Sequence, residues 1–162
     1  MKLTRLAFTA FLLTTFAPAA RAAITNVETL APDGFARGVV LTVDGYAKNE
    51  DRMTLTNFPV LVRLSGETIP GFSYSDINFP TKANADICFV AEDGTPLAFD
   101  IDTWDTTANA TSLVWCTLPV MTNGTEFAMF YKGQSSGKDV YGGNAFTNYV
   151  GVWHLGETGD AA

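Results

Sequence analysis

Residues 58–64 read Phe58-Pro59-Val60-Leu61-Val62-Arg63-Leu64, and this stretch decides the fold class. Phe58, Val60, Val62 and Leu64 recur at every second position, so they lie on one face of an extended chain. A period of two over this length indicates a half-buried β-strand rather than a helix. We therefore expect a strand here, with these four side chains facing a core.

The same period recurs on both sides of this stretch. Further strands are expected at 39–43, 86–90, 97–101, 111–118 and 125–132, separated by turn residues such as Asn123-Gly124. The runs at 86–90 and 97–101 flank a turn and are predicted to form a hairpin. Residues 65–85 hold either a short helical turn around 73–77 or a long loop. The sequence thus predicts an all-β, antiparallel β-sandwich of the jelly-roll-like type.

The first 22 residues have the pattern of an export leader. Lys2 and Arg5 precede an apolar run at 6–16, and Ala20-Arg21-Ala22 supplies the small-x-small cleavage pattern. The apolar run is shorter than the roughly 20 residues that a bilayer crossing needs. We therefore expect cleavage after Ala22. The mature protein would then reside in the periplasm, on the cell surface or outside the cell.

Charge excludes some classes of partner. Without residues 1–22 the chain has 7 basic and 17 acidic residues, which gives a net charge of −10. Such a charge repels nucleic-acid phosphates and anionic lipid headgroups, so we expect neither partner, and no membrane insertion. About 140 mature residues suffice for one domain with a core of its own.

The two cysteines, Cys88 and Cys116, both fall in expected strands. An exported protein meets oxidising conditions, so a disulfide between them is one alternative. Burial as free thiols is the other. Two cysteines alone do not form a zinc site, which takes four ligands.

Trp104 and Trp115 are the candidates for stacking on a sugar ring, because the apolar face of a pyranose packs on an aromatic side chain. The alternative is that both tryptophans fill the core between two sheets. Trp104 is the better surface candidate, since it falls in phase with Asp100 and Asp102.

Three carboxylates lie close to Trp104 in the sequence. Asp100 and Asp102 are expected on one face of a strand, with Asp105 at its end. Oxygen ligands of this kind suit calcium, and a carboxylate pair suits glycoside hydrolysis. No motif supports either reading, and solvated acids on an exposed strand explain the pattern as well. We therefore expect no catalytic residue, no metal and no cofactor, with calcium as the alternative. His154 is the sole histidine, which leaves no histidine pair for a metal.

An ordered set of short motifs lies between Gly38 and Glu157, at 57–62, 71–76, 86–89, 93–97, 101–104, 114–119, 130–131 and 149–157. This set resembles a family of exported bacterial domains of unknown function. The family typically precedes a concanavalin A-like lectin/glucanase domain of the laminin-G type, and some members also carry an ExbB/TolQ-type proton-channel domain. The chain departs from the family pattern at Asp100, where glutamate is expected, and at both cysteines.

The resemblance also implies how the chain is divided. Residues 149–155 read as a strand, which would be the first strand of a truncated lectin-like domain at 149–162. The remaining expected segments are a signal peptide at 1–22, an N-terminal linker at 23–36, the β-sandwich domain at 37–133 and a second linker at 134–148.

Three functions fit these observations. The first is a non-catalytic exported module that contributes to glycan binding together with the downstream domains of the same polypeptide, using Trp104, Trp115, Asp100, Asp102 and Asp105. The second is a structural spacer in a surface adhesin or envelope protein. The third is an accessory domain of a polysaccharide-degrading enzyme.

Overall fold

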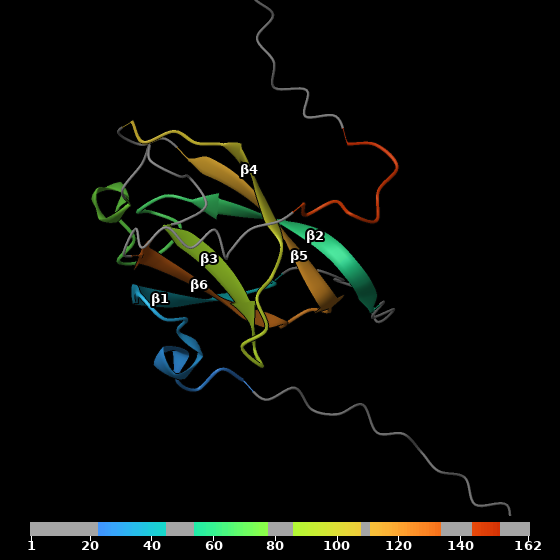
Figure 1. Cartoon of the computed structure of the whole chain (residues 1–162), viewed down its shortest axis with the longest axis horizontal. Coiled ribbons are helices and arrows are strands. Elements are labelled where there is room, and N and C mark those ends of the chain that lie inside the picture. The colour runs from blue at the N-terminus through green and yellow to red at the C-terminus, as the bar shows by residue number, and fades with distance from the viewer. Residues whose placement is uncertain (1–22, 45–53, 78–85, 108–110, 134–143, 153–162) are drawn as a thin grey trace, which may run out of the picture.

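The structure is a computed structural model that describes residues 23–44, 54–77, 86–107, 111–133 and 144–152 (Figure 1). The expected leader at 1–22 and His154 lie outside these residues. Within them are six strands and two short 3-10 helices. The elements are η1 (Val27–Leu30), β1 (Phe35–Thr42), β2 (Leu55–Leu64), η2 (Tyr74–Asp76), β3 (Ile87–Ala91), β4 (Phe99–Thr103), β5 (Ser112–Met121) and β6 (Glu126–Gly133).

The strands form two antiparallel three-stranded sheets, which confirms the predicted all-β sandwich. The first sheet has the order β1-β6-β3 and the second has the order β2-β5-β4. Figure 1 shows the two sheets as two layers. The six strands expected between residues 39 and 132 are present, and of the two alternatives for 65–85 the short helical turn is observed, as η2.

The core lies between the two sheets and is built from alternate residues of each strand. In β6, for example, Phe127, Met129 and Tyr131 face this core, and all three are buried. Phe89 of the first sheet contacts Phe99 of the second sheet edge-on, with ring centroids 5.3 Å apart. The alternation in the sequence therefore predicted the core face of this strand.

The stretch at 58–64 forms the greater part of β2 and largely behaves as predicted. Val60, Val62 and Leu64 pack in the core, whereas Phe58 is 36% exposed. The partner strand β5 runs past Pro119 to Met121, although the sequence suggested that Pro119 would end it. Pairing continues on both sides of this proline, because a proline removes one ladder donor without breaking the rest of the strand.

The predicted hairpin between 86–90 and 97–101 is wrong. The chain turns as a hairpin would, and the Leu97 N–H donates to the Phe89 carbonyl at 2.9 Å. The pairing extends only as far as an isolated antiparallel bridge between Val90 and Pro96. The Thr117 N–H then donates to the Ala98 carbonyl at 2.9 Å, so the chain crosses to the second sheet. As a result β3 pairs with β6, and β4 pairs with β5.

The residues expected as an N-terminal linker pack against the outer face of the first sheet. We call residues 23–34 the N-terminal segment. Its apolar side chains Ile24, Val27 and Leu30, together with Phe35, cover a second apolar cluster on that face. The cluster consists of Cys88, Val90, Ala128 and Phe130, each at most 1% exposed. Both faces of β3 and β6 are therefore buried.

At the other end of the described chain, residues 144–149 lie against the second sheet, and we call them the C-terminal segment. Residues 149–152 form no strand, contrary to the strand expected from Tyr149 onward. A strand needs a hydrogen-bonded neighbour, and these residues pair with neither sheet. Residues 153–155 lie outside the described part. No helix in that part is long and apolar enough to cross a membrane.

Candidate functional site

The outer face of the second sheet gathers two of the five predicted site residues. Asp100 of β4 stands opposite Trp115 of β5, which in turn stands opposite Leu61 of β2. Leu61 is 42% exposed, and the Trp115 side chain is half-buried. An acid, an indole ring and an aliphatic side chain thus form one row across the three strands.

The C-terminal segment lies on part of this row. The Ala145 N–H donates to Oδ2 of Asp100 at 2.7 Å, and the Thr117 hydroxyl donates to the Ala145 carbonyl oxygen. The rings of Trp115 and Phe146 meet edge-on with centroids 5.7 Å apart. Phe146 in turn contacts Tyr149, with centroids 5.8 Å apart. Trp115 and Asp100 therefore both bind another part of the same chain.

Trp104 does not share this face, contrary to the sequence phase. The register of β4 against β5 shifts between Ile101 and Thr103, so that Asp102 is an extra residue in a β-bulge. Thr103 takes the face position after Asp100, and Trp104 then points to the core side. A one-residue bulge reverses the face of every residue beyond it.

On the core side, the Trp104 ring packs against Tyr74. The two rings meet edge-on, with centroids 5.5 Å apart and planes at 90°. The Tyr74 hydroxyl donates to the Leu64 carbonyl oxygen at 2.7 Å and lies 2.9 Å from the Ser112 hydroxyl oxygen. Trp104 therefore packs against the core cluster, as the alternative reading from the sequence had it.

The three aspartates do not form a common site. Among the described residues, no group of three or more histidine, cysteine or acidic side chains is placed to hold a metal ion. Asp105 accepts hydrogen bonds from the Thr107 N–H at 2.9 Å and from its hydroxyl at 2.7 Å. The backbone bond, followed by the hydroxyl bond, lowers the pKa of Asp105. Asp105 thus stabilises a turn, Asp100 holds Ala145, and Asp102 sits exposed in the bulge.

The two cysteines are free thiols, so the disulfide alternative is wrong. Cys88 belongs to the outer apolar cluster of the first sheet, whereas Cys116 lies in the core between the sheets. Both side chains are fully buried. Burial raises the pKa of Cys88 to about 12, although a backbone hydrogen bond from Phe130 opposes the shift. Burial also raises the pKa of Cys116.

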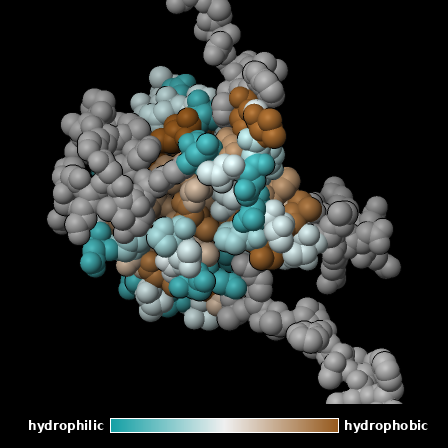
Figure 2. Space-filling view, turned by 45° about the vertical axis from the view of Figure 1, so that its right-hand side comes forward, coloured by the Kyte–Doolittle hydropathy of each residue, from teal (hydrophilic) through white to brown (hydrophobic). Residues whose placement is uncertain are grey.

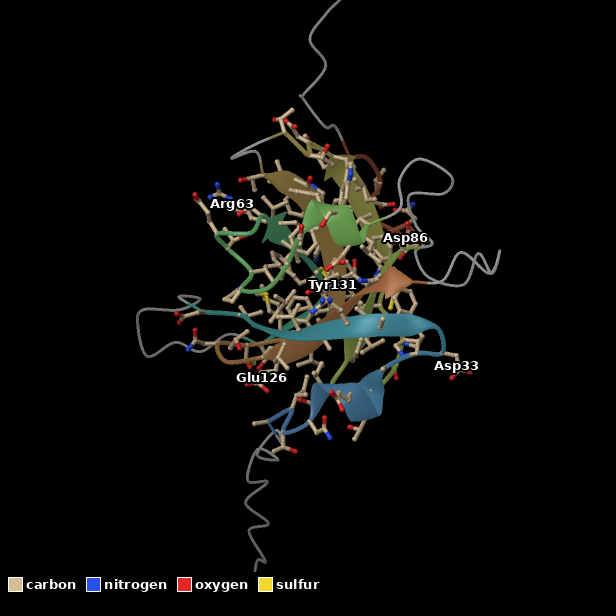
Figure 3. The ribbon with its side chains drawn as sticks, turned by 90° about the vertical axis from the view of Figure 1, so that its left-hand side faces the viewer. Asp33, Arg63, Asp86, Glu126 and Tyr131 are labelled. Atoms are coloured by element: carbon tan, nitrogen blue, oxygen red, sulfur yellow. The ribbon has the colours of Figure 1, made fainter. Side chains whose placement is uncertain are left out.

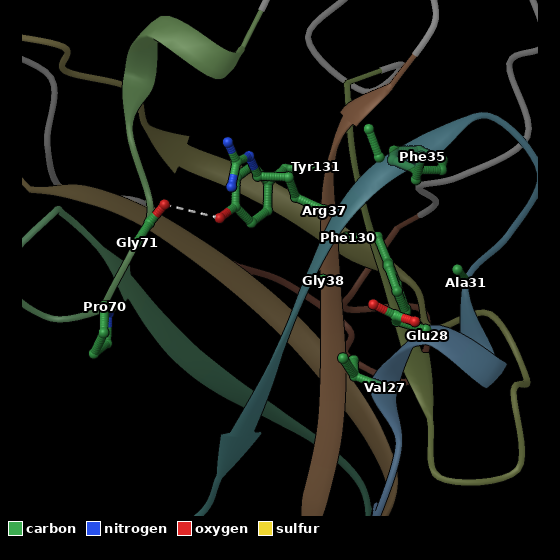
Figure 4. Close-up of a pocket in the computed structure, with 11 residues that line it drawn as sticks. Val27, Glu28, Ala31, Phe35, Arg37, Gly38, Pro70, Gly71, Phe130 and Tyr131 are labelled. Atoms are coloured by element: carbon green, nitrogen blue, oxygen red, sulfur yellow. Dashed lines mark hydrogen bonds between the residues drawn. The ribbon is translucent and has the colours of Figure 1, made fainter.

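One hollow lies at the first sheet, away from the predicted residues (Figure 4). It has a volume of about 490 Å³, and Arg37, Glu28 and Tyr131 are among its lining residues. The Tyr131 hydroxyl donates to the Gly71 carbonyl oxygen at 3.1 Å. Arg37 pairs with Asp76 of η2 at 3.3 Å, and Lys132 pairs with the same carboxylate at 3.0 Å. These polar groups thus join η2 to the first sheet.

A second hollow of about 450 Å³ lies between the edges of β1 and β2, and both apolar residues such as Phe127 and the charged residues Asp44 and Arg63 line it. On the face seen in Figure 2, apolar side chains occur in small groups separated by polar ones. Neither hollow contains a residue set that the sequence singled out for binding.

Sequence reasoning missed Thr117, Ala145 and Phe146 as parts of the site. The stretch at 134–148 has the glycines and polar residues of a linker, and an isolated aromatic residue such as Phe146 was the signal available. The chain matches no protein-family model, no curated protein and no solved structure.

Proposed function

We propose that this chain is a non-catalytic structural module of an exported protein, whose sandwich holds the C-terminal segment in a fixed position. One observation carries the proposal. Both backbone groups of Ala145 bind side chains of the second sheet, one from β4 and one from β5, and the residue is 2% exposed. A residue held from two strands has little freedom to move relative to the sheet.

The contacts between the C-terminal segment and the second sheet give an attachment of moderate strength. A hydrogen bond to a charged group contributes about 1.5–3 kcal/mol, and an aromatic pair adds about 0.5–1.5 kcal/mol. Ordering one residue of backbone costs about 1–2 kcal/mol. These amounts are comparable over a short segment, so the position of the C-terminal segment depends on each contact with the sheet.

The structural role also accounts for the residues that suggested a glycan site. Stacking on a sugar needs an open aromatic face, whereas Trp115 contacts Phe146 and Trp104 contacts Tyr74. The leader pattern and the family resemblance supply the remaining context: an exported protein in which the sandwich accompanies a lectin-like domain. In this proposal the sandwich is the spacer that orients such a domain.

Hydrogen exchange of the Ala145 amide in the exported chain tests the proposal. We expect a protected amide whose exchange accelerates about tenfold or more in Asp100→Ala, because the bond to a charged acceptor is lost. Asp33→Ala, which removes an exposed carboxylate in the turn before β1, is the matched control and should leave the amide protected. An Ala145 amide that exchanges freely in the wild-type chain would contradict the proposal.

A glycan-array screen of the same chain, with and without calcium, tests the competing function. Saturable binding that is lost in Trp104→Ala or Trp115→Ala would replace the structural role with glycan binding. Binding that requires calcium would in addition implicate the aspartates.

A further inference from the structure

A hydrogen bond to a charged group attaches the N-terminal segment to the first sheet. The Ile24 N–H donates to Oε2 of Glu126 at 2.7 Å, across a sequence separation of 102 residues. Figure 3 shows Glu126 at the end of the molecule where the N-terminal segment lies. Glu126 is half-buried at the start of β6. The attached residue directly follows Ala23, the first residue expected after leader cleavage.

From this geometry we propose that removal of the leader after Ala22 creates an ammonium group on Ala23 that pairs with the Glu126 carboxylate and strengthens docking of the N-terminal segment on the first sheet. In the cleavage step, a leader peptidase adds water across the Ala22–Ala23 peptide bond. The C–N bond breaks, Ala22 leaves with a carboxylate, and Ala23 keeps the nitrogen as an amine that takes up a proton at neutral pH.

Covalent geometry places the new charge within reach of the carboxylate. The nitrogen atoms of consecutive residues are at most about 3.8 Å apart, so the Ala23 nitrogen lies within about 6.5 Å of the Glu126 oxygen that binds Ile24. Rotation about the ψ angle of Ala23 changes this distance, so the free terminus can adjust to the carboxylate. Before cleavage the same nitrogen is a neutral amide and offers no such attraction.

The surroundings favour a cation at this position. Ala23 and Ile24 line a small depression of about 190 Å³ together with Glu92, which follows β3, and its other lining residues are uncharged. Acidic groups from β6 and from the turn after β3 therefore lie near the amine, and no basic residue lines the depression.

The pairing has a consequence for the whole first sheet. The N-terminal segment covers the cluster that contains Val90, Ala128 and Phe130. If the segment docks less firmly, this apolar surface is open to water more often. The processed chain is therefore expected to be more stable than a chain with a neutral group at position 23.

The experiment uses the chain expressed with its own leader and purified after export. Mass spectrometry first determines the N-terminal residue, and a start other than Ala23 overturns the proposal. The melting temperature is then measured at pH 6.5 and low salt for the free amine and for the same chain acetylated on that amine. Each form is prepared as wild type, as Glu126→Gln and as Glu67→Gln. The Glu126→Gln substitution keeps an acceptor for the Ile24 N–H but removes the charge, and Glu67→Gln removes an exposed carboxylate from the turn after β2.

We expect acetylation to lower the melting temperature by about 1–4 °C in the wild type and in Glu67→Gln, and to have no effect in Glu126→Gln. Equal effects of acetylation in all three chains overturn the proposal.

The pairing also fixes the direction in which the stabilisation changes with pH. A partner that favours the charged amine raises its pKa in the folded state, so the stabilisation is complete at pH 6.5 and is lost as pH rises through the folded pKa. It should also shrink in 1 M salt.

A second measurement keeps the proposal testable if Glu126→Gln does not fold. The Ala23 methyl signal of the wild-type chain is titrated by NMR in buffer and in denaturing urea. A higher pKa of the amine in the folded chain supports the pairing, and equal pKa values contradict it.

Discussion

The outer faces of the two sheets are covered in different ways. On the first sheet, apolar side chains of the N-terminal segment cover Phe130 and its neighbours, which are almost fully buried. On the second sheet, the backbone of Ala145 is hydrogen-bonded to the side chains of Asp100 and Thr117, and Phe146 contacts Trp115. Leu61 remains 42% exposed on that face. In Figure 1 the two segments lie on opposite sides of the molecule.

The two covers serve different purposes: the one on the first sheet stabilises the fold, and the one on the second sheet holds a segment in place. The buried apolar area on the first sheet contributes free energy of folding roughly in proportion to its size. The second sheet instead uses a few directional contacts, which fix a position at a lower total energy. We infer that the covered first face is part of the folded core, and that the second face serves as an attachment surface.

The largest expected effect tests this comparison directly. Phe130→Ala removes a buried ring from the covered face and should lower the free energy of unfolding by about 3–5 kcal/mol. Trp115→Ala removes a half-buried ring from the other face and should cost less, about 1–2 kcal/mol. Urea denaturation followed by circular dichroism measures both. Equal losses would mean that the two faces contribute equally to stability.

A smaller effect is expected at Gly38, which pairs with Phe130 across β1 and β6. A Cβ atom at Gly38 would come within 2.5 Å of the Phe130 ring. Gly38→Ala must therefore displace the ring and should cost about 1–3 kcal/mol. At Gly66 an added Cβ meets nothing closer than 3.5 Å, so Gly66→Ala should change the unfolding free energy by less than about 0.5 kcal/mol. Comparable costs at the two positions would argue against close packing under Gly38.

Thiol labelling gives the finest test of the comparison. At pH 8 neither cysteine should react in the folded chain, since both are buried and burial raises the pKa of each thiol. Leu30→Ala loosens the N-terminal segment over Cys88 and should speed labelling of Cys88 about tenfold, which corresponds to about 1.4 kcal/mol of docking energy. Cys116, in the core, should label at an unchanged rate. Mass spectrometry of labelled peptides distinguishes the two sites, and equal acceleration at both would show global unfolding instead.

Local sequence patterns predict the positions of the strands well, but they predict poorly which strands pair with each other. The alternation in β2 and β6 predicted which of their side chains face the core, with Phe58 as the exception in β2. The turn between 86–90 and 97–101 forms, but the predicted hairpin stops at the isolated Val90–Pro96 bridge, because the Ala98 carbonyl bonds to Thr117 of β5. A turn motif specifies how the chain reverses and leaves open which sheet receives the next strand.

The candidate site shows the same limit more sharply. A period of two from Asp100 predicts that Trp104 lies on the outer face, whereas the extra residue in the bulge turns it to the core side. Ala145 is bonded to Asp100, 45 positions away, and to Thr117, 28 positions away. No local sequence pattern predicts contacts of this kind. The hydrogen bond from Ile24 to Glu126 spans 102 positions, and no local pattern predicts it either.

The sequence by itself determined the all-β class, the places of the six strands and the acidic charge, because these depend on the period, composition and turn chemistry of neighbouring residues. Only the tertiary structure decided that β3 and β4 separate into different sheets, that both cysteines stay free and that two segments expected as linkers cover the outer faces. Those outcomes depend on which surfaces meet in space, and the free energy of burying them is shared between residues far apart in the chain.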